Sequence, residues 1–174
     1  QLPSNEFPIF ESGDSLNSIT LRSQDLKTLI NSTSFAMGNQ DWRHYLNGLF
    51  LKLEEGVLTA VATDAHRLAL NCVDSVSDIN FSGIIPRKSV NEINRFIGDD
   101  NSELSLAIND TSLVLSNDNL TFKSKLIDGA FPDYNQVIPT GDSSLLDVNV
   151  KDFVSSLGRV LSLIHISEPT RHRR

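Results

Sequence analysis

Cysteine, histidine and long apolar runs are scarce in this sequence of 174 residues. A single cysteine, Cys72, excludes an internal disulfide and a zinc site built from cysteines, and it predicts a protein of the reducing cytoplasm. No apolar run reaches the ~18–20 residues that a membrane helix needs, and the polar start of the chain lacks the pattern of a secretory signal. The net charge of −7 argues against a protein that holds nucleic acid by bulk charge alone.

Motifs of catalysis are also missing from the sequence. It has no glycine-rich phosphate loop and no Gly-x-Ser-x-Gly nucleophile motif. Asp64 and His66 could form an acid–base pair, but a spacing of two residues on a turn usually sends the side chains in different directions. We expect Cys72 to be a small buried residue. We therefore predict no catalytic residue, no metal site and no cofactor, and we interpret the acidic pairs at 54–55 and 99–100 as solvated turns.

What the sequence does contain is apolar periodicity of two kinds. Alternation predicts strands at 19–21, at three segments between 45 and 72, near 81–85, and at 104–108, 113–115 and 120–122. Helical spacing from Leu26 to Thr33 predicts one helix, with Ser23 as its N-cap, and a second is predicted from Pro86 to Ile97, closed by Gly98. We expect residues 128–139, with Gly129, Pro132 and Pro139, to form a loop that leads out of the domain. The fold class is therefore α+β.

The opening pattern returns 127 residues later. The positions that coincide in character are Ile19 with Leu146, Leu21 with Val148, Asp25 with Asp152, Leu26 with Phe153 and Ile30 with Leu157. The repeat predicts a strand over 146–148 and a helix from 150 onwards. We therefore expect a linker over 1–15, one complete domain over 16–141, and the opening strand and helix of a similar domain over 142–160.

The last residues are a separate case. Leu161 to Arg171 spell LSLIHISEPTR, which looks like a translated sequencing-adaptor end that continues to Arg174. We therefore predict that residues 161–174 are an artefact and exclude them from the fold. The alternative is the genuine end of an amphipathic helix.

Two basic segments are the best candidates for binding. Arg87 and Lys88 fall in the first turn of the second helix, where cations are disfavoured by ~0.3–1 kcal/mol, and this broken rule indicates a role for positive charge. The alternative is that both side chains bend into solvent. The segment from Gln40 to Tyr45 interleaves amide, cationic and aromatic groups, which suits phosphates and unstacked bases. Its alternative is a turn whose Trp42 and Tyr45 anchor the core.

Four motifs follow one another along the chain: FAMGNQDWRHYLNG at 35–48, VATDAHRLA at 61–69, PRK at 86–88 and SKLIDGAFPDY at 124–134. Together they resemble the bacterial DNA sliding clamps, the beta subunits of DNA polymerase III, from about Phe7 to Val160. In that family each chain has three like-folded domains, and two chains close head to tail into a ring around duplex DNA. The resemblance implies antiparallel sheets on the outside and two helices lining the inner face. It also implies that residues 1–15 end a first clamp domain, 16–141 form the middle domain and 142–160 begin the third.

The resemblance assigns two sets of binding residues. Those that match the family's DNA contacts are Gln40, Arg43, His44, Tyr45, Arg87 and Lys88. Those that match its cleft for short peptides containing Gln and Leu or Phe are Leu46, Thr63, Ala65, His66, Arg67, Leu68, Pro132, Gln136 and Val137. The cleft lies between the middle and third domains of the family.

Three of these positions depart from the family's pattern. Ala65 stands where glycine is usual, so the backbone of its turn could differ if the position needs a positive φ. His44 replaces a common tyrosine and Gln136 a common arginine, and each change could weaken one contact.

The expected function is that of a non-enzymatic processivity factor. The implied partners are duplex DNA, encircled without regard to sequence, and the DNA polymerase III catalytic subunit, the clamp loader and repair polymerases, bound through peptide motifs. A second copy closes the ring in the full-length protein, and we expect the present chain alone not to close one. The alternative is an unrelated α+β peptide-binding domain that does not encircle DNA.

Overall fold

The computed structural model describes residues 18–75, 77, 79–98, 102–139, 141 and 146–166, the last five of these by their backbone alone. The chain divides into two compact units, one ending at Pro132 and the other beginning at Asp133. The expected linker over 1–15 and the acidic pair at 99–100 lie outside the described residues.

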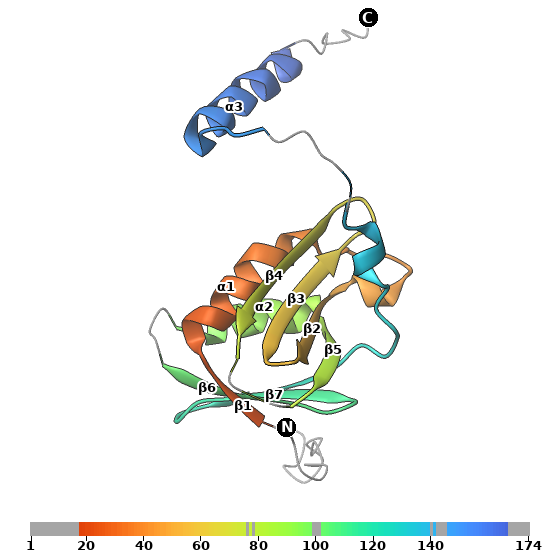
Figure 1. The fold of residues 1–174 in the computed structure, drawn as a ribbon, viewed down its shortest axis with the longest axis vertical. Helices are drawn as coiled ribbons and strands as arrows, with labels where there is room; N and C mark the ends of the chain where they lie inside the picture. Colours follow the sequence, from red (N-terminus) through yellow and green to blue (C-terminus); the bar gives the residue numbers. More distant parts are fainter. Residues whose placement is uncertain are drawn as a thin grey trace, which may run out of the picture. The chain divides into compact units, whose positions relative to one another are not determined.

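The described part of the first unit contains two antiparallel sheets of four strands (Figure 1). One has the order β1-β6-β7-β8, formed by β1 (Ser18–Arg22), β6 (Glu103–Ile108), β7 (Ser112–Ser116) and β8 (Thr121–Lys125). The other has the order β4-β3-β2-β5, formed by β4 (Leu68–Asp74), β3 (Val57–Thr63), β2 (Gly48–Glu54) and β5 (Phe81–Pro86). These eight strands confirm those that the apolar alternation predicts between residues 19 and 122. Glu55 and Gly56, both at positive φ, make the two-residue turn between β2 and β3.

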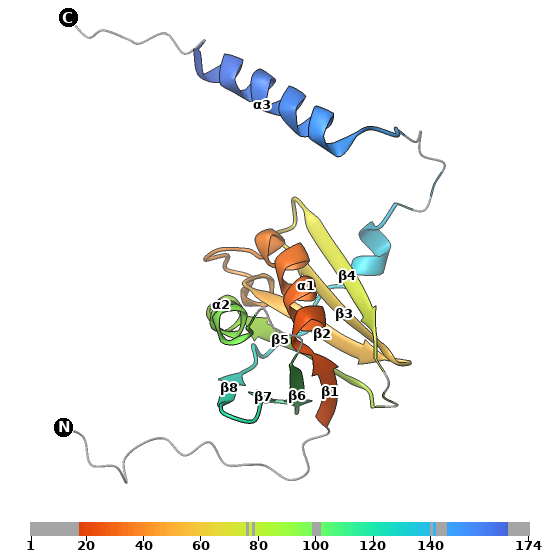
Figure 2. The ribbon, with the colours of Figure 1, turned by 90° about the vertical axis from the view of Figure 1, so that its left-hand side faces the viewer.

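Two helices, α1 (Ser23–Thr33) and α2 (Arg87–Phe96), lie next to each other on the same face of the β4-β3-β2-β5 sheet (Figures 1 and 2). This confirms the expected arrangement of two helices on one side of an antiparallel sheet. The prediction of Ser23 as N-cap is wrong. Arg22 holds that position without a side-chain cap, because Ser23 is already helical and fully buried, and its backbone N–H donates to the Ser102 carbonyl at 2.9 Å.

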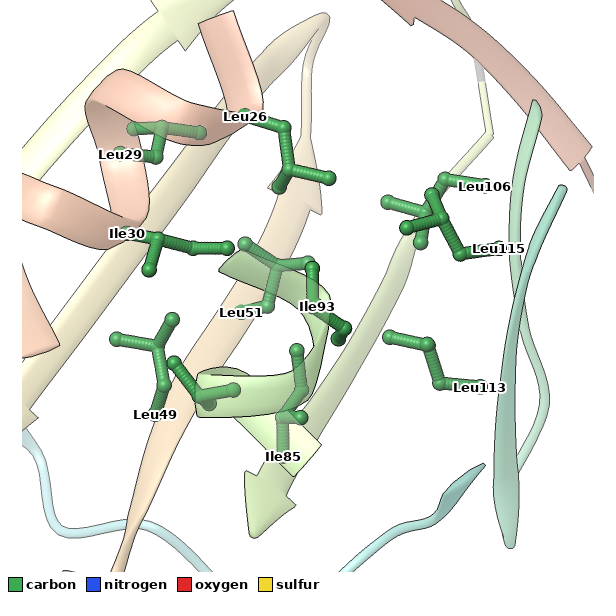
Figure 3. Close-up of a pocket in the computed structure, with 11 residues that line it drawn as sticks. Leu26, Leu29, Ile30, Leu49, Leu51, Ile85, Ile93, Leu106, Leu113 and Leu115 are labelled. Atoms are coloured by element: carbon green, nitrogen blue, oxygen red, sulfur yellow. The ribbon is translucent and has the colours of Figure 1, made fainter. Parts of the chain in front are cut away.

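The core lies where the two helices and both sheets converge (Figure 3). One void in this core measures only about 10 Å³. Every residue around the void is aliphatic: Leu26, Leu29, Ile30, Leu49, Leu51, Ile85, Val90, Ile93, Leu106, Leu113 and Leu115. A space of this size and polarity holds neither a ligand nor an ordered water. This void is therefore no candidate binding site.

The segment after β8 is held against β5 and β2. The Ile127 backbone N–H donates to the Ile84 carbonyl at 2.8 Å. The Phe131 ring stacks on the Phe50 ring, with centroids 4.7 Å apart and planes 4° from parallel. These contacts fix the path of the chain up to Pro132.

The second unit contains a short 3-10 helix, η4 (Tyr134–Val137), and the helix α3 (Val150–Ile166). The start of α3 falls 127 positions after the start of α1, as the repeat predicts. The predicted strand over 146–148 is wrong: residues 146–149 have no regular secondary structure, and Leu146 and Val148 are exposed. A strand needs a hydrogen-bonding neighbour, and no described strand pairs with this segment.

Helix α3 passes the boundary expected at Leu161 and continues to Ile166, as the helix-end alternative predicts for these six residues. Residues 167–174 lie outside the described part, and the assignment of 161–174 to an adaptor stays a prediction. Among the described helices, none combines the length and the apolar character that crossing a membrane requires.

Candidate functional site

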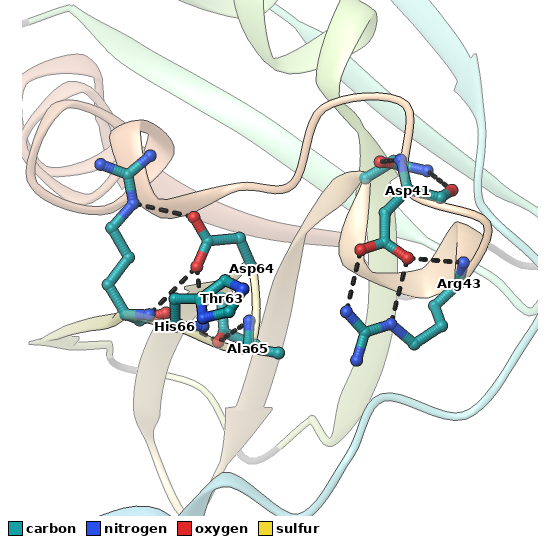
Figure 4. A network of polar contacts seen from close by, with 8 residues as sticks. Asp41, Arg43, Thr63, Asp64, Ala65 and His66 are labelled. Carbon is teal, nitrogen blue, oxygen red and sulfur yellow. Dashed lines mark hydrogen bonds and ion pairs between the residues drawn. The ribbon is translucent and has the colours of Figure 1, made fainter.

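The loop before β2 is built around the Asp41 carboxylate (Figure 4). The Arg43 backbone N–H donates to Asp41 Oδ1 at 2.8 Å, and the Arg43 guanidinium donates through Nε to Oδ1 at 3.0 Å and through Nη2 to Oδ2 at 2.9 Å. The hydrogen bonds from the Arg43 side chain, and next that from its backbone, lower the pKa of Asp41 to about 2, and the charge of Arg43 makes a smaller contribution. The ion pair is therefore formed at neutral pH.

Asn47 closes the same loop from its other end. The Asp41 backbone N–H donates to Asn47 Oδ1 at 2.9 Å, and Asn47 Nδ2 donates to the Asp41 carbonyl at 2.7 Å. The Gly38 N–H donates to the Leu46 carbonyl at 2.8 Å. Residues 38–47 are thus a hydrogen-bonded loop, hereafter the Asp41 loop.

Arg87 joins this loop to α2, so the structure brings the two basic segments together. The Arg87 backbone N–H donates to the Asn47 carbonyl at 3.0 Å. Its Nη1 donates to the carbonyls of Met37 at 3.0 Å and Gly38 at 3.2 Å. Arg87 is therefore half-buried and bonded to backbone, while its neighbour Lys88 is exposed. The alternative of a side chain bent into solvent is wrong for Arg87.

The other candidate DNA residues lie on the Asp41 loop with differing exposure. Gln40 and His44 are exposed, and Tyr45 is half-buried. A Cβ atom at Gly129 would lie 3.9 Å from that of Tyr45, so the segment after β8 passes next to this turn. Trp42 is 82% exposed, which makes the core-anchor alternative wrong for this residue. Trp42 was absent from both predicted sets, although the mixed composition of the segment contained the signal.

The second cluster is the turn Thr63–Leu68 that joins β3 to β4 (Figure 4). Asp64 Oδ1 accepts from the backbone N–H groups of His66 and Arg67, both at 3.0 Å, and Oδ2 accepts from Arg67 Nε at 3.0 Å. The His66 N–H, followed by that of Arg67, lowers the pKa of Asp64. The carboxylate therefore shapes the turn. These bonds do not direct it at the His66 imidazole, in agreement with the expected separation of the two side chains.

Ala65 adopts the left-handed conformation in this turn, at φ 72°. Its N–H donates to Thr63 Oγ1 at 3.1 Å, and Thr63 Oγ1 in turn donates to the Arg67 carbonyl at 2.7 Å. These hydrogen bonds hold alanine in a conformation that costs an L-residue ~1–2 kcal/mol. The positive φ explains why glycine suits this position.

Replacing Ala65 with glycine is therefore expected to raise the free energy of unfolding by about 0.5–1 kcal/mol, since relief of the strain exceeds the added entropy of the unfolded chain. Urea titration would measure the change. The matched control is Ala130→Gly, at an exposed alanine without a positive φ, which is expected to lower the stability. A loss in both variants would contradict the assigned strain.

The candidate peptide-binding residues fall in both units. In the first unit Leu46 is only 2% exposed and Thr63 is also buried, Leu68 is half-buried, and Ala65, His66, Arg67 and Pro132 are exposed. In the second unit Gln136 and Val137 lie on η4, and Gln136 Nε2 donates to Asp133 Oδ2 at 2.9 Å. Leu46 is therefore packed beneath the surface.

The last residues to consider are Cys72 and the potential metal ligands. Cys72 is exposed on the edge strand β4, so its predicted burial is wrong. No group of three or more potential metal ligands occurs within the part of the chain that the structure describes.

The chain is similar to proteins of one family in every comparison. Residues 20–133 match the family described as DNA polymerase III beta subunit, central domain. The beta sliding clamp of Pseudomonas aeruginosa is 39% identical over 147 residues, which cover 83% of this chain and 40% of that protein. The clamp of Proteus mirabilis is 42% identical over 140 residues, covering 79% and 38% of the two chains.

Solved structures give the same result. The sliding clamp of Bacillus subtilis matches 99% of this chain and 45% of its own, with a TM-score of 0.89 and 29% identity. The beta subunit from P. aeruginosa matches 80% and 39% with a TM-score of 0.77 and 39% identity, and another clamp structure from that organism is bound to griselimycin. The chain spans about two fifths of the length of these relatives.

Proposed function

The chain belongs to the DNA polymerase III beta subunit family, the bacterial sliding clamps, and from this premise we propose that it is part of a non-catalytic processivity factor. The complete protein would form a ring from two copies around duplex DNA and work in the bacterial cytoplasm. Residues 16–141 would be its middle domain, and 142–160 the start of the third. Family membership removes the alternative of an unrelated α+β interaction domain.

The observation that carries the DNA-binding part of the proposal is the junction between α2 and the Asp41 loop. Arg87 holds the two together through backbone carbonyls. This leaves Lys88, Gln40 and His44 exposed on adjoining segments. Few cations on an otherwise acidic protein suit a ring that is linked topologically to DNA and must slide along it.

The turn Thr63–Leu68 and Pro132, all in the first unit, would form part of the cleft for partner peptides. The half-buried Leu68 offers apolar surface at the end of a turn made rigid by Asp64. The exposed His66 and Arg67 offer polar groups that orient a bound peptide. The partners proposed are the DNA polymerase III catalytic subunit, the clamp loader and repair polymerases.

A binding titration tests the proposed cleft. We expect a labelled peptide containing Gln and Leu or Phe to bind the 174-residue chain saturably, and Leu68→Ala to weaken the binding about tenfold or more, because the side chain's apolar contact is lost. The matched control is Leu70→Ala, two residues along β4 and 41% exposed, which should leave the affinity nearly unchanged. Absence of binding, or equal losses in the two variants, would contradict the cleft.

A further inference from the structure

Trp42 is a large aromatic side chain held in water by a rigid loop. It is 82% exposed, whereas tryptophan is usually buried or placed at an interface. The backbone is bonded on both sides of it, since the N–H of Asp41 donates to Asn47 Oδ1 and that of Arg43 donates to Asp41 Oδ1. The backbone that carries the ring is therefore fixed by the loop before any ligand arrives, which lowers the entropic cost of binding.

Trp42 is surrounded by polar side chains, one of which carries a planar guanidinium group. The Arg43 guanidinium lies 5.6 Å from the centroid of the indole and is itself fixed by the Asp41 carboxylate. The exposed neighbours on the loop, Asn39, Gln40 and His44, all carry hydrogen-bonding groups. An anchor for a partner protein would instead be expected within an apolar patch that excludes water.

We propose that Trp42 is a stacking platform for an unpaired base, so that the Asp41 loop binds single-stranded DNA. This inference rests on the proposed function and deepens it, because it adds a single-stranded ligand to a surface assigned to duplex DNA. Aromatic rings stack on every base irrespective of sequence, and loops that combine them with cations and amides bind single strands. Lys88, on the helix that Arg87 joins to the loop, would contact the phosphates.

Trp42 and Lys88 should contribute to single-strand binding in different ways, because only Lys88 supplies net charge. The charge of Arg43 is balanced by Asp41, so the indole and guanidinium supply contact area with little net charge. Lys88 is exposed and supplies charge. Removal of Trp42 should therefore weaken single-strand binding at every salt concentration alike, whereas removal of Lys88 should reduce the salt dependence.

The fluorescence of Trp42 provides a direct test, because it is the only tryptophan of the chain. The 174-residue protein would be titrated at about 50 mM salt with an oligothymidylate of about 20 nucleotides, and separately with a duplex of equal length. Stacking predicts quenching by the oligothymidylate and a smaller change with the duplex. Anisotropy of a labelled oligothymidylate should show about tenfold weaker binding for Trp42→Ala and near-normal binding for Trp42→Phe.

Phe35→Ala is the matched control. Phe35, on the 3-10 helix η2 (Ser34–Ala36), is 58% exposed, and the Arg67 guanidinium lies 5.9 Å from its ring centroid, so this pair repeats the combination of aromatic ring and guanidinium away from the Asp41 loop. This variant should bind the oligothymidylate like the unchanged protein. Equal losses in Phe35→Ala and Trp42→Ala would overturn the proposal, and so would unchanged affinity in Trp42→Ala or absence of binding to the single strand.

Two outcomes distinguish this inference from the proposed function. If Lys88→Ala weakens duplex binding while Trp42→Ala leaves single-strand binding intact, the stacking platform is wrong and the clamp function stands. If the fluorescence of Trp42 responds to the docking peptide and not to the oligothymidylate, Trp42 belongs to the peptide surface and the inference is overturned.

Discussion

Arg87→Ala is expected to destabilise the first unit by about 2–3 kcal/mol, whereas Lys88→Ala should leave its stability unchanged. The two cations are neighbours in the sequence and match the same family motif, yet their surroundings differ. Arg87 donates to the carbonyls of Met37 and Gly38, some fifty positions away in the chain. Removing the guanidinium leaves two partly buried carbonyls without this donor and releases one end of the Asp41 loop.

Both substitutions should weaken DNA binding, but for different physical reasons. Lys88→Ala removes an exposed charge, so it should weaken duplex binding. The slope of log binding constant against log salt concentration should become shallower by up to about one unit. Arg87→Ala should weaken binding because the loop that carries Gln40 and His44 loses its support. Arg87→Lys separates charge from geometry, since lysine keeps the charge and lacks the planar fork that reaches both carbonyls.

Urea denaturation and salt-dependent DNA binding of the three variants would test these expectations. Since a free surface cation contributes little to stability, equal stability in Arg87→Ala and Lys88→Ala would show that the bonds to Met37 and Gly38 are not formed in solution. Full stability in Arg87→Lys would assign the effect to charge.

The strands were predictable from the sequence because alternation is a local property. The segments from Gly48 to Thr63 alternate and end at polar turns, so their pairing follows from the chain itself. Alternation does not tell which face of a strand is covered. Cys72 shares its side of the edge strand β4 with exposed Leu70, and this accounts for the wrong expectation of burial.

The sequence predicted which residues belong to the candidate site, but it did not predict the hydrogen bonds that join them. Composition marked the segment from Gln40 to Tyr45 and the pair Arg87 and Lys88, but it could not tell that the two segments are joined. That link connects residues far apart in the chain, which no local spacing reveals. The same limit applies to Trp42, because a mixed polar and aromatic segment is equally compatible with a buried or an exposed ring.

Gly48→Ala is expected to cause the largest loss of stability, about 3 kcal/mol or more. A Cβ atom at Gly48 would lie 2.5 Å from the Ile85 carbonyl oxygen and 2.8 Å from Ile84 Cγ2. The first of these is backbone in the neighbouring strand, so β2 and β5 would have to separate where Gly48 pairs with Pro86. Overpacking of this kind cannot be relieved by a change of rotamer.

The position of Gly48 extends the effect to the candidate site. Gly48 follows Asn47, which closes the Asp41 loop and accepts from the Arg87 N–H, so a displaced strand would move the loop and the start of α2 together. We expect the melting temperature to fall by about 10 °C or more, and DNA binding to be lost with it. The matched control is Gly158→Ala on α3, where an added Cβ meets nothing within 4 Å and alanine favours the helix. A Gly48→Ala variant that melts like this control would show that β2 and β5 can separate without cost, and the close packing that supports the Asp41 loop would then be wrong.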